Sequence, residues 1–488
     1  MAVSRREMLA SMLAAGPAPA IAQRQRRPNI VLILSDDHRY DAMSCAGHPW
    51  LKTPNLDRLA ARGARFANAF VTTSLCSPSR ASILTGQYMH AHGVVDNFTK
   101  LPKDLATFPK VLQSAGYRTA FFGKWHMGDS KLITGGEDSD SPQPGFDKWV
   151  AFPGQGAYVD PLLNFNGTRR KVKGYISDIL TNEAVEYLDS QDGDAPFCLY
   201  LSHKAVHAGF EPTERHQSLY ANHPVSIPAS ATVREGKPDW LLKKRDISRH
   251  GLNNLYAGQF TFEHLYRQYM RTVMGIDASV GAVLDTLEKR GLSDNTLVIY
   301  LGDNGFLLGE QGLVDKRVMH EPSIRVPMLA AWPGRIPAGT VRDELALNLD
   351  IAPTFVDAAG LPPVPSMHGN SLLKLFGDRP ANWRKDFVYE YFWDWEALHT
   401  PGVLGLRTER HSFMEYQGIW DINELYEIQS DPQQIRNLIA SAKVTTQAGG
   451  WLNLVEDKKT RELLRSLRAR MVKILNETGG AHLTSGPQ

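Results

Sequence analysis

Four short apolar runs stand out along the chain, and polar residues follow each of them. Residues 30–34, 119–122, 197–201 and 297–301 are continuous stretches rich in aliphatic, β-branched and aromatic side chains. Uninterrupted stretches of this length are typical of strands that are buried on both faces. We therefore predict four core strands whose carboxyl ends bring polar side chains to one edge of a sheet.

A helical pattern is clearest over residues 266–290, where apolar side chains recur with a period of 3.6 residues before Gly291. Alternation of such helices with buried strands predicts an α/β fold, with a large, mostly parallel sheet sandwiched by helices. Residues 210–260 are richer in Pro, His and charged residues and show weak periodicity. We interpret them as a long surface excursion.

A proline-rich segment at residues 361–365 marks the expected end of a catalytic domain spanning residues 28–365. Beyond it, residues 404–408 and 411–416 are predicted to pair as short strands. Leu464, Leu467, Met471 and Leu475 are spaced as on a terminal amphipathic helix. Residues 366–488 are therefore predicted to form a smaller α+β C-terminal subdomain with a small antiparallel sheet and a terminal helix.

The N-terminus has the pattern of an export signal. Residues 4–9, Ser-Arg-Arg-Glu-Met-Leu, resemble a twin-arginine motif, and an apolar stretch then leads to the small-residue site Ala-Ile-Ala at residues 20–22. The stretch is far shorter than the ~20 residues that span a bilayer, so no membrane anchor is expected. We predict that residues 1–22 are a cleaved twin-arginine-type signal peptide and that the mature protein is periplasmic or secreted.

Composition narrows the classes of partner. The net charge is +2, and Lys and Arg are spread along the chain without a basic stripe, so no nucleic-acid partner is expected. Three cysteines provide no disulfide framework. The fold must therefore be stabilised by its core.

Residues 76–80 read Cys-Ser-Pro-Ser-Arg and are predicted to open a helix, with Pro78 suited to its first position and Gly86 ending it. This pentapeptide resembles the Cys-x-Pro-Ser-Arg signature of the type I sulfatases, which have an alkaline-phosphatase-like fold. The resemblance implies that a maturation enzyme oxidises Cys76 to formylglycine and that the hydrated aldehyde is the nucleophile. An unmodified thiolate and a structural buried cysteine are the competing interpretations.

Asp36 and Asp37 follow the first predicted strand, and Asp303 and Asn304 follow the last. Three carboxylates and one amide oxygen suit a hard cation, so calcium or magnesium is expected rather than zinc, which usually recruits His or Cys. An isolated Asp-Asp pair would be better explained as a solvated turn, but two such pairs at strand ends favour a metal site. The resemblance implies that these four residues bind the metal together with the modified Cys76.

Arg80 lies one helical turn beyond Cys76, so its guanidinium can reach the nucleophile and a bound sulfate. Lys124 and His126 are two residues apart at a strand end and should point to one side. A Lys-x-His pair on a strand can also arise by chance. Both residues match the Gly-Lys-Trp-His-x-Gly motif of the sulfatases, here residues 123–128.

His207 is placed where sulfatases have a His followed two residues later by Pro, although this chain has Gly209 there. His203 is the rival because it lies nearer the strand. The resemblance implies that His207 protonates the leaving oxygen and that His126 accepts a proton from the nucleophile. Lys316, within a segment common in glycan sulfatases at residues 315–327, is implied to contact the ester oxygen.

Family-like segments occur in order from Asp36 to residues 424–438, so the resemblance covers essentially all of the mature chain. It implies a sulfatase that cleaves a sulfate monoester, with a sulfated carbohydrate as the expected substrate. A phosphomonoester or phosphonate hydrolase of the same superfold and a non-catalytic sulfated-glycan binding protein are the alternatives. The expected substrate contacts are His203, His320, Trp393, Trp395, His399 and Arg407.

Overall fold

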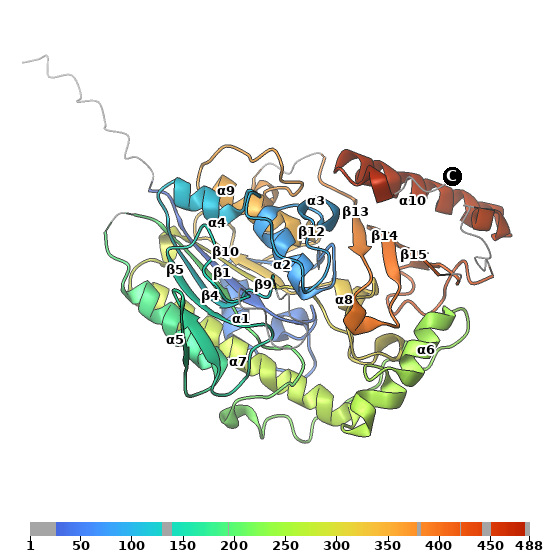
Figure 1. Cartoon of the computed structure of the whole chain (residues 1–488), viewed down its shortest axis with the longest axis horizontal. Coiled ribbons are helices and arrows are strands. Elements are labelled where there is room, and N and C mark those ends of the chain that lie inside the picture. The colour runs from blue at the N-terminus through green and yellow to red at the C-terminus, as the bar shows by residue number, and fades with distance from the viewer. Residues whose placement is uncertain are drawn as a thin grey trace, which may run out of the picture.

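Ten strands form one large mixed sheet at the centre of the protein (Figure 1). The computed structural model describes residues 26–128, 139–193, 195–377, 382–419, 421–441 and 450–483. The predicted signal peptide, residues 1–22, lies outside the described residues. In spatial order the strands are β11 (Thr340–Arg342), β2 (Ala64–Phe66), β10 (Met328–Ala331), β9 (Thr296–Gly302), β1 (Asn29–Ser35), β8 (Phe197–Ser202), β4 (Arg118–Lys124), β5 (Lys148–Phe152), β6 (Leu162–Phe165) and β7 (Thr168–Lys171).

The four predicted core strands are neighbours in this sheet, in the order β9, β1, β8 and β4, and all of them run parallel. In the register of the pairs, Ile30 lies between Leu297 on β9 and Cys198 on β8. Antiparallel pairing is confined to the flanks, where β10 joins β9 and β2, and β6 joins β5 and β7. The predicted α/β fold with its large sheet is thus confirmed, and all four polar strand ends meet at one edge.

Helices cover both faces of the sheet (Figure 1). On one face lie α2 (Cys76–Thr85), α3 (Met89–His92), α4 (Phe108–Ser114) and α9 (Ile351–Ala358). On the other lie α1 (Pro54–Arg62), α5 (Ile176–Asp189) and α7 (Phe262–Lys289), which contains the helix predicted from periodicity. The short helix α8 (Glu321–Ile324) lies before β10, and β3 (Ala69–Phe70) pairs with β12 (Ala346–Leu347) in a separate small sheet.

Alternate side chains of β1 enter two different apolar cores. Ile30, Leu32 and Leu34 pack with residues of α2, α4 and α9, whereas Val31 and Ile33 pack with residues of α1, α5 and α7. Every residue of β1 is buried. This is the arrangement that the continuous apolar run predicts, because successive strand residues face opposite sides of a sheet.

The excursion at residues 210–260 is docked on the rest of the molecule. It contains α6 (Asp239–Ile247) and several short 3-10 turns. Phe210 and Leu255 share a core with Tyr269 on α7. The Trp240 ring packs edge-on against Tyr416, with 5.1 Å between centroids. The segment therefore connects the large sheet to the C-terminal region.

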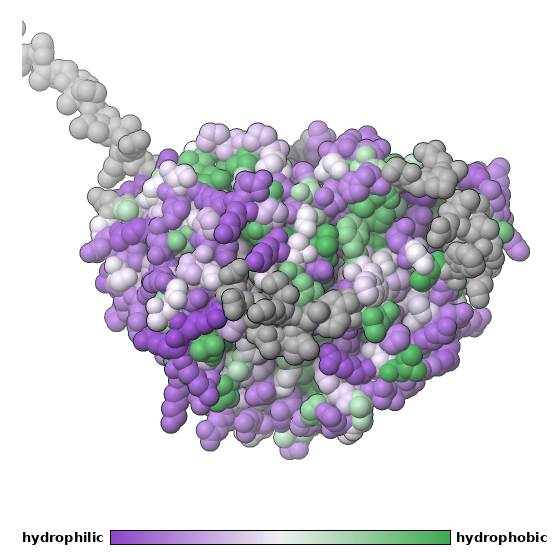
Figure 2. Space-filling model, in the orientation of Figure 1, coloured by the Kyte–Doolittle hydropathy of each residue, from purple (hydrophilic) through white to green (hydrophobic). Residues whose placement is uncertain are grey.

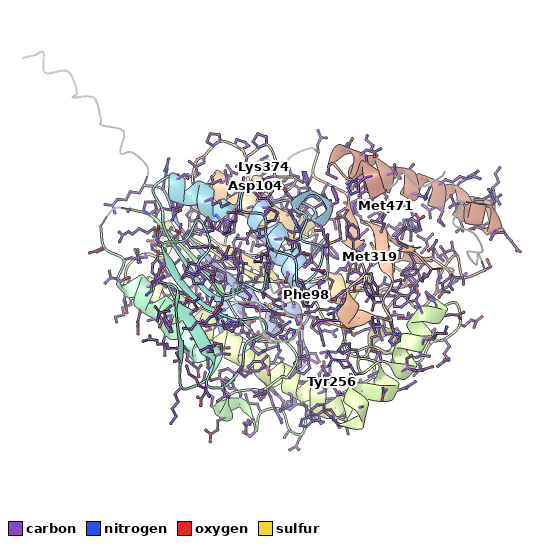
Figure 3. All side chains as sticks on the ribbon, viewed as in Figure 1. Phe98, Asp104, Tyr256, Met319, Lys374 and Met471 are labelled. Carbon is purple, nitrogen blue, oxygen red and sulfur yellow. The ribbon has the colours of Figure 1, made fainter. Side chains whose placement is uncertain are left out.

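A four-stranded antiparallel sheet and a long helix form the C-terminal region, as predicted. The strands are β13 (Asp386–Tyr391), β14 (Gly402–Thr408), β15 (His411–Gln417) and β16 (Glu424–Glu427). The helix α10 (Lys458–Glu477) covers them through its buried residues, which include Leu464 and Met471. Met471 is labelled in Figure 3. Met319 approaches β14 so closely that a Cβ at Gly405 would lie 2.1 Å from its Sδ. The sheet is thus packed directly against the segment that carries Lys316. The exact domain boundary stays a prediction.

The face of the molecule seen in Figure 2 is largely hydrophilic, with small scattered apolar patches. No helix among the described residues is both long enough and apolar enough to cross a membrane. Cys45, Cys76 and Cys198 are all free thiols.

Candidate active site

Cys76 is the first residue of α2 and is fully buried at the polar edge of the sheet. The sequence placed Pro78 at the first helical position, but the helix begins two residues earlier, so Pro78 is its third residue. This costs no hydrogen bond, because the first backbone bond of the helix runs from the Ser79 N–H to the Leu75 carbonyl at 3.0 Å. Gly86 ends the helix with φ of 67°, as predicted.

Three carboxylates converge beside Cys76. Asp36, Asp37 and Asp303 each offer an oxygen within 4.8 Å of the others, and all three are buried. Burial favours the neutral acid of Asp36, but the charges of Lys124 and Lys316 outweigh it and hold its pKa well below the usual range. Burial, against the opposing charge of Lys316, raises the pKa of Asp37 to about 7. Such crowding of buried carboxylates is typical of a site built for a cation.

Asn304 adds a fourth oxygen to the three carboxylates. Its amide nitrogen donates to Asp37 Oδ1 at 2.7 Å and to the Gly305 carbonyl at 2.9 Å. Its Oδ1 atom is buried and has no hydrogen-bond partner among the described residues. A buried amide oxygen left without a donor requires an explanation, and a bound cation would provide one. The residues at this edge therefore fit a calcium or magnesium ion.

Arg80 is 1% exposed and is held from four directions. Its Nε donates to Asp303 Oδ2 at 2.9 Å, and a terminal nitrogen lies 3.3 Å from Asp36 Oδ2. The other terminal nitrogen donates to the Lys124 carbonyl and to Ser202 Oγ, both at 2.6 Å. The guanidinium is therefore fixed beside the carboxylates with little rotational freedom.

Two lysines approach the thiol of Cys76. The Nζ of Lys316 lies 2.8 Å from Cys76 Sγ and is paired with Asp37. The Nζ of Lys124 lies 3.6 Å from the same sulfur, is paired with Asp36 and donates to Gln155 Oε1 at 2.6 Å. Lys124 and Lys316, both expected from the sequence to act on the ester, thus lie beside Cys76.

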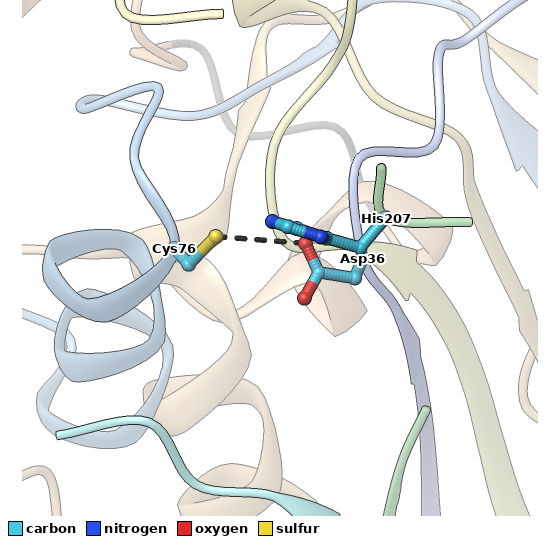
Figure 4. A group of neighbouring side chains, drawn as sticks. All are labelled: Asp36, Cys76 and His207. Atoms are coloured by element: carbon cyan, nitrogen blue, oxygen red, sulfur yellow. Dashed lines mark hydrogen bonds between the residues drawn. The ribbon is translucent and has the colours of Figure 1, made fainter. Parts of the chain in front are cut away.

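His207 rather than His203 joins this cluster. The side chains of Asp36, Cys76 and His207 form a compact group, in which Cys76 Sγ lies 3.5 Å from Asp36 Oδ1 (Figure 4). The His207 side chain is 16% exposed. His203 is fully buried, and its Nε2 lies 2.9 Å from Ser279 Oγ on α7. The geometry thus favours His207, whose loop also contains Gly209 with φ of 105°.

His126 is buried next to Ser77, whose Oγ lies 3.4 Å from its Nδ1. From the alternation of side chains along a strand, His126 was predicted to point to the same side as Lys124. However, β4 ends at Lys124, and His126 has φ of 61°. Its position is therefore set by a turn and not by the strand. Burial and the charge of Lys124 hold its pKa well below the usual value, so its imidazole is neutral.

The thiol of Cys76 itself is poorly suited to act as a thiolate. Burial and the carboxylate of Asp36 raise its pKa to about 12, in spite of the charge of Lys124. A thiolate nucleophile normally depends on a lowered pKa. The competing interpretation of an unmodified cysteine nucleophile is therefore not favoured by its surroundings.

The expected substrate contacts differ in burial and in their protein partners. Arg407 is 4% exposed and donates to Glu321 at 2.7 and 3.2 Å, so the structure gives it a protein partner. His320 is buried 3.5 Å from Glu424. Trp393 is 54% exposed and His399 is also exposed, and the side chain of Trp395 lies outside the described part of the chain. Their roles as substrate contacts stay predictions.

A buried ion network around Lys316 was not predicted from the sequence. The Lys244 ammonium on α6 lies 2.5 Å from Asp315, which is 3.2 Å from Arg317. Arg317 in turn donates to Asp394 at 3.1 Å. Asp315 and Arg317 belong to the segment at residues 315–327, but their partners Lys244 and Asp394 are distant in sequence, so no local signal could reveal the network. It fixes both neighbours of Lys316 and connects them to the excursion and the C-terminal region.

Comparison with known proteins agrees with this geometry. The sulfatase family model matches residues 28–361, more than half of the chain, and a model of the N-sulphoglucosamine sulphohydrolase C-terminal region matches residues 309–456. The fold and these matches define a hydrolase. The chain belongs to the sulfatase family and is a sulfuric ester hydrolase.

Among its relatives, the N-acetylglucosamine-6-O-sulfatase of Bacteroides thetaiotaomicron is 33% identical over 92% of this chain and 89% of its own length. The human N-acetylglucosamine-6-sulfatase is 31% identical over 76% of this chain and 68% of its own length. A protein solved in complex with its substrate D-glucosamine-2-N,6-O-disulfate has a TM-score of 0.79 and 30% identity, covering 93% of this chain and 98% of that one. A phosphonate monoester hydrolase of Agrobacterium radiobacter, with a TM-score of 0.70 and 22% identity over 91% of this chain and 96% of that one, shares the fold.

Proposed function

We propose that this sulfatase removes the 6-O-sulfate of a sulfated glucosamine. The observation that carries the proposal is the environment of Cys76, whose sulfur lies 2.8 Å from Lys316, 3.6 Å from Lys124 and 3.5 Å from Asp36. Cations around a nucleophile suit an ester group whose oxygens carry negative charge. The sugar is inferred from the names of the bacterial and human relatives and from the ligand of the solved relative.

Two additions complete the site in this proposal. A maturation enzyme oxidises Cys76 to formylglycine, and Asp36, Asp37, Asp303 and Asn304 hold calcium or magnesium together with the modified residue. When present, the hydrated aldehyde supplies one hydroxyl that attacks sulfur and a second whose deprotonation releases sulfate. The cation would neutralise charge on the sulfonate oxygens.

The remaining residues bind the ester and move protons. Arg80, Lys124 and Lys316 hold the sulfonate oxygens, and because they are fixed beforehand by buried carboxylates they need little reorganisation during the reaction. His207, at the partly exposed side of the cluster, donates a proton to the leaving sugar oxygen. His126 accepts a proton from the nucleophile side chain.

We further propose that the enzyme acts outside the cytoplasm, in the periplasm or after secretion, and that residues 1–22 direct its export. The support is the twin-arginine-like motif in residues 4–9. Extracellular relatives point the same way, such as the extracellular sulfatase homologue of Drosophila melanogaster, which is 32% identical over 75% of this chain and 33% of its own length.

The function is tested with matched ester pairs. We expect kcat/KM on an aryl sulfate to exceed that on the corresponding aryl phosphate, and glucosamine 6-O-sulfates to be the preferred members of a panel of sulfated monosaccharides. Released sulfate, phosphate and desulfated sugar are measured directly. A preference for the phosphate ester would support the phosphohydrolase alternative, and binding without turnover of the matured protein would support the glycan-binding alternative.

His207→Ala is expected to lose far more activity on a sugar sulfate than on an aryl sulfate with an acidic phenol. A sugar alcohol leaves poorly without protonation, whereas the phenol needs little, so the difference should be about 100-fold or more. His126→Ala should slow both substrates alike, because its role follows departure of the alcohol. Leaving-group dependence in His203→Ala but not in His207→Ala would contradict the assignment.

A further inference from the structure

Lys204 is a buried ammonium beside the active site, and it has no carboxylate partner among the described residues. It is 5% exposed, and its Nζ donates to the Gln155 carbonyl at 2.9 Å and lies 4.7 Å from the centroid of the Tyr158 ring. Among the residues that the structure describes, no Asp or Glu oxygen lies within 4.0 Å of this Nζ. An ammonium has three protons to donate, and the structure shows an oxygen acceptor for one of them.

The other cations of the site are compensated differently. Arg80, Lys124 and Lys316 each form an ion pair with a buried aspartate. Burial of a charge without a partner is costly, and removing the opposite charge from a buried pair is typically destabilising. Burial and the charge of Lys124 accordingly lower the pKa of Lys204 to about 8. An anion arriving at Lys204 would relieve this cost.

Gln155 connects Lys204 to the catalytic cluster. Its side-chain oxygen accepts from Lys124 at 2.6 Å, and its backbone oxygen accepts from Lys204 at 2.9 Å. The two ammonium groups are thus separated by a single residue, which is itself only half-buried. Tyr158 lies on the same side, because its hydroxyl donates to the His207 carbonyl at 2.7 Å. Lys204 therefore lies next to both a sulfate-binding lysine and the proton donor.

We propose that Lys204 is a specificity residue that binds a second sulfate group on the same sugar as the ester that is cleaved. The proposal rests on the sulfatase function above and refines its substrate to a glucosamine with two sulfates. One sulfonate lies among Arg80, Lys124 and Lys316. The second lies at Lys204, where the spare protons of the ammonium become hydrogen-bond donors to a charged acceptor. Because Gln155 contacts both ammonium groups, we expect the two sulfates to belong to one sugar unit.

The test is a change in substrate preference. Lys204→Met keeps an apolar stem against Tyr158 and removes the charge. We expect the ratio of kcat/KM for glucosamine-2-N,6-O-disulfate to that for N-acetylglucosamine 6-O-sulfate to fall about 10-fold or more, mainly through KM. Lys204→Arg should retain most of the preference. For the enzyme without substitutions, the same ratio of kcat/KM values should also fall as the salt concentration rises.

Lys148→Met is the matched control. Lys148 lies 5.4 Å from the Phe122 ring but at the opposite end of β5 from the site, and its side chain is 37% exposed. This variant should leave the ratio unchanged. Thermal unfolding of each variant shows that it is folded.

The outcomes separate this assignment from the proposed function. If Lys204→Met loses activity equally on both sugars, or retains the original ratio of kcat/KM values, the assignment is wrong. Lys204 would then support the site without binding a second sulfate group. If the enzyme without substitutions cleaves an aryl sulfate but neither sugar, the proposed glucosamine substrate is wrong, and the assignment of Lys204 is wrong with it.

Discussion

Cys76→Ala is expected to abolish sulfate ester hydrolysis, with kcat falling on the order of 10⁴-fold or more because the covalent route is lost. The same chain produced without a formylglycine-generating enzyme should be equally inactive, since burial raises the pKa of the unmodified thiol to about 12. Mass spectrometry of the peptide that contains residue 76 should show the aldehyde or its hydrate in active preparations. Activity on an aryl sulfate should follow the modified fraction.

Cys198→Ala is the matched control, because Cys198 is also fully buried but lies within β8 in the apolar core. This variant should lose some stability through the small cavity it creates and keep its kcat. Active enzyme that contains only unmodified cysteine at position 76 would contradict the formylglycine mechanism. A thiolate would then have to be the nucleophile, in spite of its surroundings.

The central sheet could be predicted because each of its core strands is buried on both faces. Leu32 and Ile33 enter opposite cores, so neither can be replaced by a polar residue without burying it. The run of apolar residues therefore identifies the strand without knowledge of its neighbours. The antiparallel flanks were not predicted: β7 has four exposed residues, Thr168–Lys171, and carries no hydrophobic pattern.

The candidate site residues could be predicted where they follow a recognisable strand or belong to a short motif. They could not be predicted where their significance depends on contacts between segments distant in sequence. Asp36 and Asp303 follow predicted strands, and these strands are neighbours in the sheet. Lys204, by contrast, is significant only because Gln155 and Tyr158 lie beside it, and the sequence gives no signal for that contact. Arg407 likewise has a buried partner, Glu321, from a segment 86 residues away.

Asp303→Asn is expected to remove the metal and almost all activity together. The substitution keeps the shape of the side chain but removes one of three carboxylate charges, and hard divalent cations depend strongly on anionic oxygen ligands. We expect kcat/KM to fall on the order of 10³-fold, since cation and oriented donors act together on the charged transition state. Elemental analysis should find calcium or magnesium in the enzyme without substitutions and a strongly reduced amount in the variant. Chelation of the metal from the enzyme without substitutions should likewise abolish turnover, and restoring calcium or magnesium should reverse this loss.

Asp303 also pairs with Arg80 at 2.8 Å, so loss of activity alone could reflect displacement of that guanidinium. A second variant, Asp37→Asn, distinguishes the two causes, because Asp37 pairs with Lys316 and not with Arg80. If the metal is the common factor, both variants lose it, and in both the thermal stabilisation by added calcium or magnesium shrinks as affinity falls. Retention of full metal content in either inactive variant would contradict its assignment as a ligand. Stoichiometric zinc that follows activity would contradict the choice of a hard cation, because the all-oxygen set of Asp36, Asp37, Asp303 and Asn304 lacks the imidazole or thiolate that zinc normally recruits.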